Sequence, residues 1–417
     1  MRVHVLALPL LLAAPVVLAD DEAESPVEAE AVTEEVVERR AEEALLNEDP
    51  EAQRQVRREL EEATEVAETP ARFSWEFYGS ARVHAINTFD VETGELRQRI
   101  GDGNSRLGLR GNWQYSPGWY LFGRYEGGFD LVENFSTRTD NSGNGGLTTR
   151  LAFLGVEHDS VTFAFGQNWS AYYQVAGITD RFAIFGGSAS GVYNADTAGQ
   201  QAGTGRAEDV FQVRTNVKPK NWVPWLKPFK LYAQYQLGQP IPKVDNLKYD
   251  FSYGFSAFLE TQSEYGIGIA YNRAVVPDEG QPALDRVGIN GDSTALAIST
   301  RTFGDRWYVS VLYSRLENME TTDQGIYFDG RGLEIFGQWQ FLDKLWLIGG
   351  YNYLQPDDDE TQAGEFRTRY SVIGARYTFR SFERMVYFEY RLDDSRLVDG
   401  SPRDNEFTIG IRWDFGT

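Results

Sequence analysis

Arginines and acidic residues that alternate with apolar residues are the side chains best suited to chemistry in this chain. In SRLGLRGNWQY, Arg106 falls on one face of an extended segment and Leu107 on the other. In GWYLFGRYEGGFDL, Arg124 and Glu126 share a face that lies opposite Leu121. Alternation with period two predicts strands with one charged and one apolar face. Fixed charges of both signs beside water can orient ions and polar solutes without making or breaking bonds.

Covalent catalysis has few candidate residues. The chain has three histidines and no cysteine, which excludes disulfides and thiolate metal sites. His84 shares the predicted polar face of Arg82, and His158 falls at a predicted turn, but neither has a Gly-x-Ser-x-Gly elbow nearby. We therefore expect no enzyme, no cofactor and no metal site.

A second feature is a stretch of about forty residues, from Trp169 to Glu208, that does not alternate. It contains GITDRFAIFGGS (177–188) and is rich in aromatic and aliphatic side chains. A loop this long and this apolar is expected to pack against other parts of the chain rather than extend into water.

The acidic charge is unevenly distributed. The formal net charge of −22 divides into −14 between Asp20 and Pro70 and −9 from Ala71 onward, with Arg2 making up the balance. An acidic surface without a basic stripe argues against binding to nucleic acid.

Residues 1–19 predict a secretory signal peptide, with Arg2 at the start, an apolar core, and Val17 and Ala19 before the cleavage site. A membrane anchor is the alternative, although the apolar run is short for a span. No later segment resembles an apolar membrane helix.

Residues 20–72 predict an acidic, partly helical periplasmic extension. Its first fifty residues contain no aromatic residue and no glycine, and Asp49 followed by Pro50 is typical of a helix start. The narrow face of small residues allows either self-association as a coiled coil or a solvated acidic spacer.

From Phe73 to Phe415 the period of two persists, and about sixteen segments have the pattern of strands. The strands are long, aromatic residues gather at the ends of their apolar faces, and short turns alternate with long polar connections. A sheet in hydrocarbon must close because no backbone group can go unpaired there. The chain is therefore predicted to be all-β, a 16-stranded antiparallel transmembrane barrel over residues 73–415.

Within that range the chain resembles the trimeric general porins of Gram-negative outer membranes. The resemblance is carried by FYGSARV, NSRLGLRG, TTRLAFLGVEH and FGQNWSAYYQVAGITDRFAIFGG, which match the family's first, second and fourth strands and its third loop in order. It implies that the loop around GITDRFAIFGGS folds into the barrel and narrows a water-filled channel. An outer loop that covers the mouth is the alternative.

The resemblance also assigns a pore constriction. It places an arginine ladder opposite the loop and acids on both sides of the gap. Ser80 occupies the position of a pore lysine of some relatives, and Arg82, two residues on along the same face, is expected to replace that lysine. The implied constriction residues are Arg82, Arg106, Arg150, Arg214, Glu126, Asp180, Ile184, Phe185, Gly186 and Gly187. Ile184 departs from the family, which has a glutamate there, and Gly416-Thr417 extends beyond the usual terminal phenylalanine.

These observations predict a passive diffusion channel for small hydrophilic solutes, located in the outer membrane. A solute-specific channel is an alternative, as is a porin whose residues 20–70 also tether a cell-envelope partner. The expected partners are two further copies in a homotrimer, outer-membrane lipid and lipopolysaccharide, and small solutes. Ile184 in place of an acid predicts a weak preference for anions or none.

Overall fold

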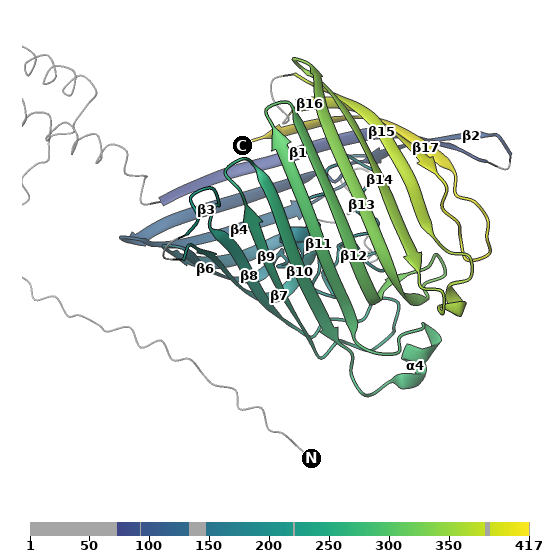
Figure 1. Ribbon diagram of the computed structural model, residues 1–417, viewed down its shortest axis with the longest axis horizontal. Helices are drawn as coiled ribbons and strands as arrows, with labels where there is room; N and C mark the ends of the chain where they lie inside the picture. Colours follow the sequence, from purple (N-terminus) through teal and green to yellow (C-terminus); the bar gives the residue numbers. More distant parts are fainter. Residues whose placement is uncertain (1–72, 92, 133–146, 220–221, 380–383, 417) are drawn as a thin grey trace, which may run out of the picture. The chain divides into compact units, whose positions relative to one another are not determined.

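The computed structural model describes residues 73–91, 93–132, 147–219, 222–379 and 384–416. The predicted signal peptide and acidic extension lie outside these residues. Most of the described residues lie in strands (Figure 1). The strands are β1 (Phe73–Phe89), β2 (Leu96–Asp102), β3 (Arg106–Ser116), β4 (Trp119–Gly128), β5 (Thr148–His158), β6 (Val161–Trp169), β7 (Arg206–Val217), β8 (Phe229–Leu237), β9 (Phe251–Glu260), β10 (Tyr265–Val275), β11 (Ser293–Gly304), β12 (Trp307–Thr321), β13 (Tyr327–Leu342), β14 (Leu345–Pro356), β15 (Thr368–Thr378), β16 (Arg384–Asp393) and β17 (Asn405–Phe415).

Three short helical segments occur in the connections: α3 (Tyr173–Ala176), α4 (Gln281–Arg286) and the 3-10 turn η1 (Thr361–Ala363). No helix among the described residues has the length and apolar character needed to cross a membrane.

The strands form a closed antiparallel barrel. Consecutive strands pair with each other, except that β2 and β3 both pair with β1 instead. The barrel closes where β1 pairs with β17, from Gly79 opposite Phe415 to Phe89 opposite Asn405. Of the seventeen strand segments, β2 and β3 pair with the two ends of the same β1, so together they form one strand of a sixteen-stranded barrel. The predicted closed barrel of sixteen strands is confirmed.

The break between β2 and β3 has a local cause. Asn104 adopts a left-handed backbone conformation with φ of 73°, which interrupts the extended chain. The amide of Gly103 still donates to the carbonyl of Arg82 at 3.0 Å, and the amide of Ser105 donates to Asp102 Oδ2 at 2.8 Å. The backbone therefore stays paired across the interruption, and β3 begins at Arg106.

The two faces of the wall differ in polarity, as the period of two predicts. Val309, Tyr313 and Ile335 lie on an apolar face and are exposed, whereas Ser310 and Glu334 lie on the other face and are buried. Exposed apolar side chains of this kind suit contact with hydrocarbon. We call the two sides the apolar face and the polar face.

The largest buried cluster joins the connection between β6 and β7, residues 170–205, to the polar face. Tyr172, Val175 and Val192 of this connection are fully buried together with Leu312 and Leu316 of β12. The apolar content of the connection is therefore explained by packing.

Candidate functional site

Glu126 is the centre of a charged cluster on the polar face of β3, β4 and β5. Its side chain is only 4% exposed and contacts three arginines: Arg150 Nε at 2.9 Å, Arg124 Nη2 at 2.7 Å and Arg106 Nε at 3.9 Å. The hydroxyl of Tyr78 donates to Glu126 Oε2 at 3.0 Å. Three guanidinium groups on one carboxylate leave the cluster positive, and their mutual repulsion is offset by that single acid.

A second part of the cluster lies next to the first, on β1 and β17. Arg412 donates to both carboxylate oxygens of Asp414, at 2.8 and 3.0 Å from Nε, and Ser80 donates to Asp414 Oδ1. Arg82 Nε donates to Ser80 Oγ at 2.7 Å. We call Arg82, Arg106, Arg124, Arg150, Arg412, Glu126 and Asp414 the wall cluster.

Arg214 does not belong to the wall cluster. Its Nη2 atom contacts Glu157 Oε2 at 3.2 Å and Thr162 Oγ1 at 3.1 Å. Thr162 directly follows the short turn between β5 and β6, and Arg214 is exposed. Of the four arginines that the sequence groups together, the structure brings Arg82, Arg106 and Arg150 together and places Arg214 apart.

Two buried carboxylates hold the connection of residues 170–205 to the polar face. Glu389 of β16 accepts hydrogen bonds from the backbone amides of Ala183, Ile184 and Phe185, at 2.6, 3.0 and 3.2 Å. Glu334 of β13 accepts from the amide of Ala189 at 2.8 Å. Because both carboxyl groups are buried, these hydrogen bonds fix the path of the connection.

Neutral and cationic groups of the wall complete this attachment. Tyr308 and Ser310 donate to the carbonyl of Ile178 at 2.8 and 3.2 Å, and Ser314 donates to the carbonyl of Ala189 at 2.6 Å. Arg376 Nη2 donates to the carbonyl of Arg181 at 2.5 Å. These contacts come from β12 and β15, so the connection is held by several strands.

The segment AIFGG at 183–187 turns against the wall. Phe185 is buried with Tyr370 and Val372, and Gly187 has φ of 70°, a conformation that favours glycine. Ile184 packs partly against the same group of side chains. Sequence reasoning treated Ile184 as a missing pore charge, whereas the structure gives this side chain a packing contact.

Asp180 is one of the two acids in the connection of residues 170–205. Its Oδ2 accepts from the hydroxyls of Tyr193 at 2.6 Å and Tyr173 at 3.4 Å. Burial raises the pKa of the Asp180 carboxyl, and the two tyrosine hydrogen bonds partly oppose that rise. Burial also raises the pKa of Tyr173, and the positive charge of Arg106 acts in the opposite direction. Tyr173 therefore lies within electrostatic reach of Arg106 in the wall cluster.

Sequence reasoning missed several members of this site. Arg412 and Asp414 occupy alternate positions of EFTIGIRWDF, so their shared polar face could have identified them. Glu334 and Glu389 carry no such signal, because nothing in the sequence shows which wall residues meet a connection more than a hundred residues away. Their role depends on the closed barrel.

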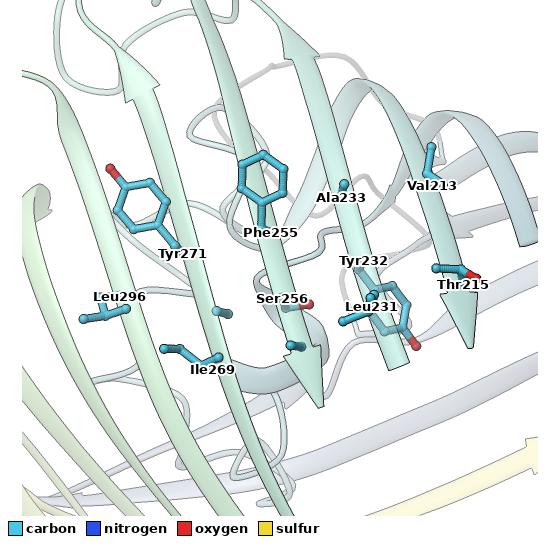
Figure 2. Close-up of a pocket in the computed structure, with 12 residues that line it drawn as sticks. Val213, Thr215, Leu231, Tyr232, Ala233, Phe255, Ser256, Ile269, Tyr271 and Leu296 are labelled. Atoms are coloured by element: carbon cyan, nitrogen blue, oxygen red, sulfur yellow. The ribbon is translucent and has the colours of Figure 1, made fainter. Parts of the chain in front are cut away.

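A depression of about 490 Å³ lies on the other side of the wall (Figure 2). It is bordered by side chains of the apolar face, including Val213, Leu231, Phe255 and Ile269, with the small Ala233 between them. Its apolar lining suits hydrocarbon, and it is separated from the wall cluster by the sheet. We do not include it in the site.

A closed barrel with a charged polar face and an apolar outer face is the architecture of an outer-membrane channel. The sequence profile described as Gram-negative porin matches residues 63–397. The chain belongs to the Gram-negative porin family.

Curated relatives agree with this assignment. Outer membrane porin PhoE of Salmonella typhimurium is 25% identical over 349 residues, which cover 81% of this chain and 91% of the relative. Outer membrane protein S2 of Salmonella typhi is 25% identical over 347 residues, covering 74% and 85% of the two chains.

Solved structures share the fold of this porin. OmpF of Salmonella typhi, in complex with daunomycin, aligns with a TM-score of 0.64 at 20% identity, covering 82% of this chain and 97% of that one. The anion-selective porin from Comamonas acidovorans aligns with a TM-score of 0.61 at 14% identity, covering 82% and 100%. The protein is an outer-membrane β-barrel that forms a channel for passive diffusion of small hydrophilic solutes.

Proposed function

We propose that residues 170–205 lie inside this porin's barrel and form the narrowest part of the channel together with the wall cluster. One observation carries the proposal. On the polar face, Glu334 and Glu389 accept hydrogen bonds from backbone amides of this connection, and Tyr308 and Ser314 donate to its carbonyls. In a barrel whose apolar face contacts lipid, the polar face lines the lumen.

In this arrangement the charges of the wall cluster create an electric field across the gap. Such a field orients water and dipolar solutes and hinders apolar ones. Arg82, Arg106, Arg124, Arg150 and Arg412 outnumber Glu126 and Asp414, so the field favours anions. Phe185, Gly186 and Gly187 shape the connection rather than supply charge, and Ile184 has the same role.

The experiment is deletion of Phe182 to Ser188, which removes the segment bound by Glu389. We expect a folded barrel with a higher single-channel conductance in planar bilayers. A matched deletion of Asp358 to Thr361, in the connection that contains η1, should leave conductance unchanged. Unchanged conductance in the first variant, with normal heat-modifiable gel mobility, would place the connection outside the lumen.

A solute-specific channel is the second candidate. Trp169 and Tyr173 stack with their ring centroids 3.9 Å apart and an interplanar angle of 19°, beside the charged gap. Sugars and planar solutes bind well to such aromatic surfaces. Saturable block of conductance by one solute, lost in Trp169→Ala, would favour this function over general diffusion.

Assembly of the porin and its N-terminal segments are also open to test. We propose a homotrimer in contact with lipopolysaccharide, which native mass spectrometry of the purified protein can measure. Residues 1–19 are proposed to direct export, and residues 20–70 to form a periplasmic extension that contacts a cell-envelope partner. Deleting residues 20–70 should then leave the conductance normal, while the outer membrane loses its attachment to the rest of the cell envelope. No catalytic role is proposed for His84 or His158.

A further inference from the structure

The connection between β7 and β8, residues 218–228, is unlike the other connections at its end of the barrel. The amide of Asn216 donates to the carbonyl of Ser160, so β7 ends beside the short turn between β5 and β6. The β3–β4 and β5–β6 turns contain two residues each, but this connection has eleven. Short turns of outer-membrane barrels face the periplasm, so this longer connection lies at the periplasmic end.

Its composition is equally distinct. Four of the seven lysines of the chain fall between Lys218 and Lys230, in KPKNWVPWLKPFK, and this stretch contains no acidic residue. The same stretch contains two tryptophans and three prolines. A basic stretch rich in tryptophan is unexpected in a protein of net charge −22, in which arginine otherwise supplies nearly all positive charge.

Backbone hydrogen bonds fix the second half of the connection against the neighbouring strands. The amide of Lys227 donates to the carbonyl of Glu260 at 2.7 Å, and the amide of Gln262 donates to the carbonyl of Trp225 at 2.8 Å. Trp222 donates from Nε1 to the carbonyl of Leu226 at 2.9 Å. The connection is therefore attached to the end of β9 and the turn that follows it.

This attachment leaves apolar side chains exposed at the edge of the apolar face. The ring of Trp222 packs on Phe229, the first residue of β8, with 4.9 Å between centroids. Trp225 is 60% exposed and Val223 is 39% exposed. Tryptophan prefers the boundary between lipid hydrocarbon and headgroups, where its ring is in contact with both.

The lysines of this stretch differ in their partners. Lys227 Nζ pairs with Glu264 at 2.7 Å, and Lys230 Nζ pairs with Glu260 at 2.7 Å. Glu260 also pairs with Arg301. Lys230 alternates with Leu231 of the apolar face, so this group of three lies on the polar face and does not face lipid. Lys218 is exposed and, among the described residues, makes no ion pair with a carboxylate. The long flexible stem of lysine allows its ammonium group to reach lipid phosphates.

We propose that Lys218, Val223, Trp225 and Lys227 form a binding site for anionic phospholipid at the periplasmic leaflet. The tryptophan and valine would insert at the headgroup boundary, and the ammonium groups would contact the lipid phosphate and other headgroup anions. An acidic cell-wall polymer would satisfy the charges, but it would leave the exposed apolar side chains in water. The exposed apolar side chains therefore favour a lipid.

The test compares two double variants of the full chain. Lys218→Gln/Trp225→Ala changes the proposed site, whereas Lys344→Gln/Trp339→Ala removes one exposed lysine and one exposed tryptophan elsewhere at the same end. Each protein is mixed with phosphatidylglycerol and phosphatidylethanolamine in equal amounts, and retained lipid is measured by native mass spectrometry. We expect the wild type and the control to prefer phosphatidylglycerol, and the site variant to bind it about tenfold more weakly.

Several outcomes would overturn the proposal. The wild type could bind phosphatidylglycerol and phosphatidylethanolamine equally well. The control variant could lose as much phosphatidylglycerol binding as the site variant. The site variant could also keep its preference for phosphatidylglycerol while its gel mobility and conductance are normal. Competition by free glycerol phosphate as strong as by the whole lipid would show a simple anion site. Binding to purified cell-wall sacculi that depends on Lys218 and Trp225, without lipid preference, would identify a cell-wall contact instead.

Discussion

At the scale of single residues, Glu126 determines how the wall cluster behaves. It is the only acid within ion-pair distance of Arg106, Arg124 and Arg150 in the described part of the chain, and its side chain is 4% exposed. Arginine stays ionised in proteins, so the carboxylate is what keeps the three guanidinium groups together. Alternation put Arg106 and Glu126 on polar faces, and the family resemblance supplied Arg150, but only the register of β3, β4 and β5 shows that all of them meet.

Glu126→Gln should raise the preference for anions, because it removes the one negative charge among three positive ones. We also expect a loss of about 1–3 kcal/mol in the free energy of unfolding, since buried charged groups lose their partner. Reversal potentials in salt gradients measure the first effect, and urea unfolding followed by gel mobility measures the second. Glu157→Gln, which affects the exposed pair with Arg214, should change both much less. A shift toward cations in Glu126→Gln would contradict this account of the cluster.

The buried carboxyl of Asp180 should make the stability of the folded protein depend on pH. Burial raises the pKa of this carboxyl, so the folded protein favours its neutral form. That contribution to stability is fully present below the pKa of an unfolded aspartate, about 3.9, and is lost as pH rises through the folded-state pKa. Each unit by which folding raises the pKa corresponds to about 1.4 kcal/mol at high pH.

Asp180→Asn should therefore become more stable relative to the wild type as pH increases from about 3.9 toward neutrality. Thermal unfolding of both proteins across this range measures the difference. Asp196→Asn is the matched control, because Asp196 is an acid of the same connection that is exposed and pairs with Lys243. A difference between Asp180→Asn and the wild type that is constant with pH would show that folding does not raise the pKa of Asp180.

At the scale of elements, the strands could be predicted and the attachment of the connection could not. In a half-buried strand, apolar and polar side chains alternate every two residues. This alternation identifies β3, which begins at Arg106, and β17, whose alternate apolar residues end at Phe415. The connection of residues 218–228 did not stand out among the short turns, because proline-rich segments lack any period. Glu334 and Glu389 act across a long sequence separation, and alternation carries no information about such contacts.

Glu389→Gln tests how the connection is held. The neutral amide is a weaker acceptor for the amides of Ala183, Ile184 and Phe185, and it leaves Arg376 without its carboxylate. We expect more frequent spontaneous conductance fluctuations in single-channel records and a loss of about 1–3 kcal/mol in stability. Glu406→Gln is the control, since this polar-face acid pairs with Arg391 and Thr88 instead. Current records as quiet as those of the wild type would mean that other contacts suffice to hold the connection.

At the scale of the whole molecule, two charge distributions of opposite sign act on a passing ion. Residues 71–417 carry a net charge of −9, whereas the wall cluster is positive. Which one an ion senses depends on distance and on screening by salt. At about 1 M salt the screening length is about 3 Å, so only charges lining the narrow part of the channel act. At about 0.01 M it is about 30 Å, which extends to the acidic connections at the rim.

The preference of the channel for anions should therefore decrease as the salt concentration is lowered. We expect a preference for anions near 1 M, set by the wall cluster, and a shift toward cations near 0.01 M, where the distant acids also act. Reversal potentials measured at a fixed ratio of salt concentrations, with the mean concentration lowered stepwise, give this dependence directly. In Arg106→Ala the high-salt preference should weaken while the low-salt shift remains, because the two effects come from different residues. A preference that stays constant, or that moves toward anions on dilution, would show that the charges of the rim do not reach the channel and that the wall cluster alone determines selectivity.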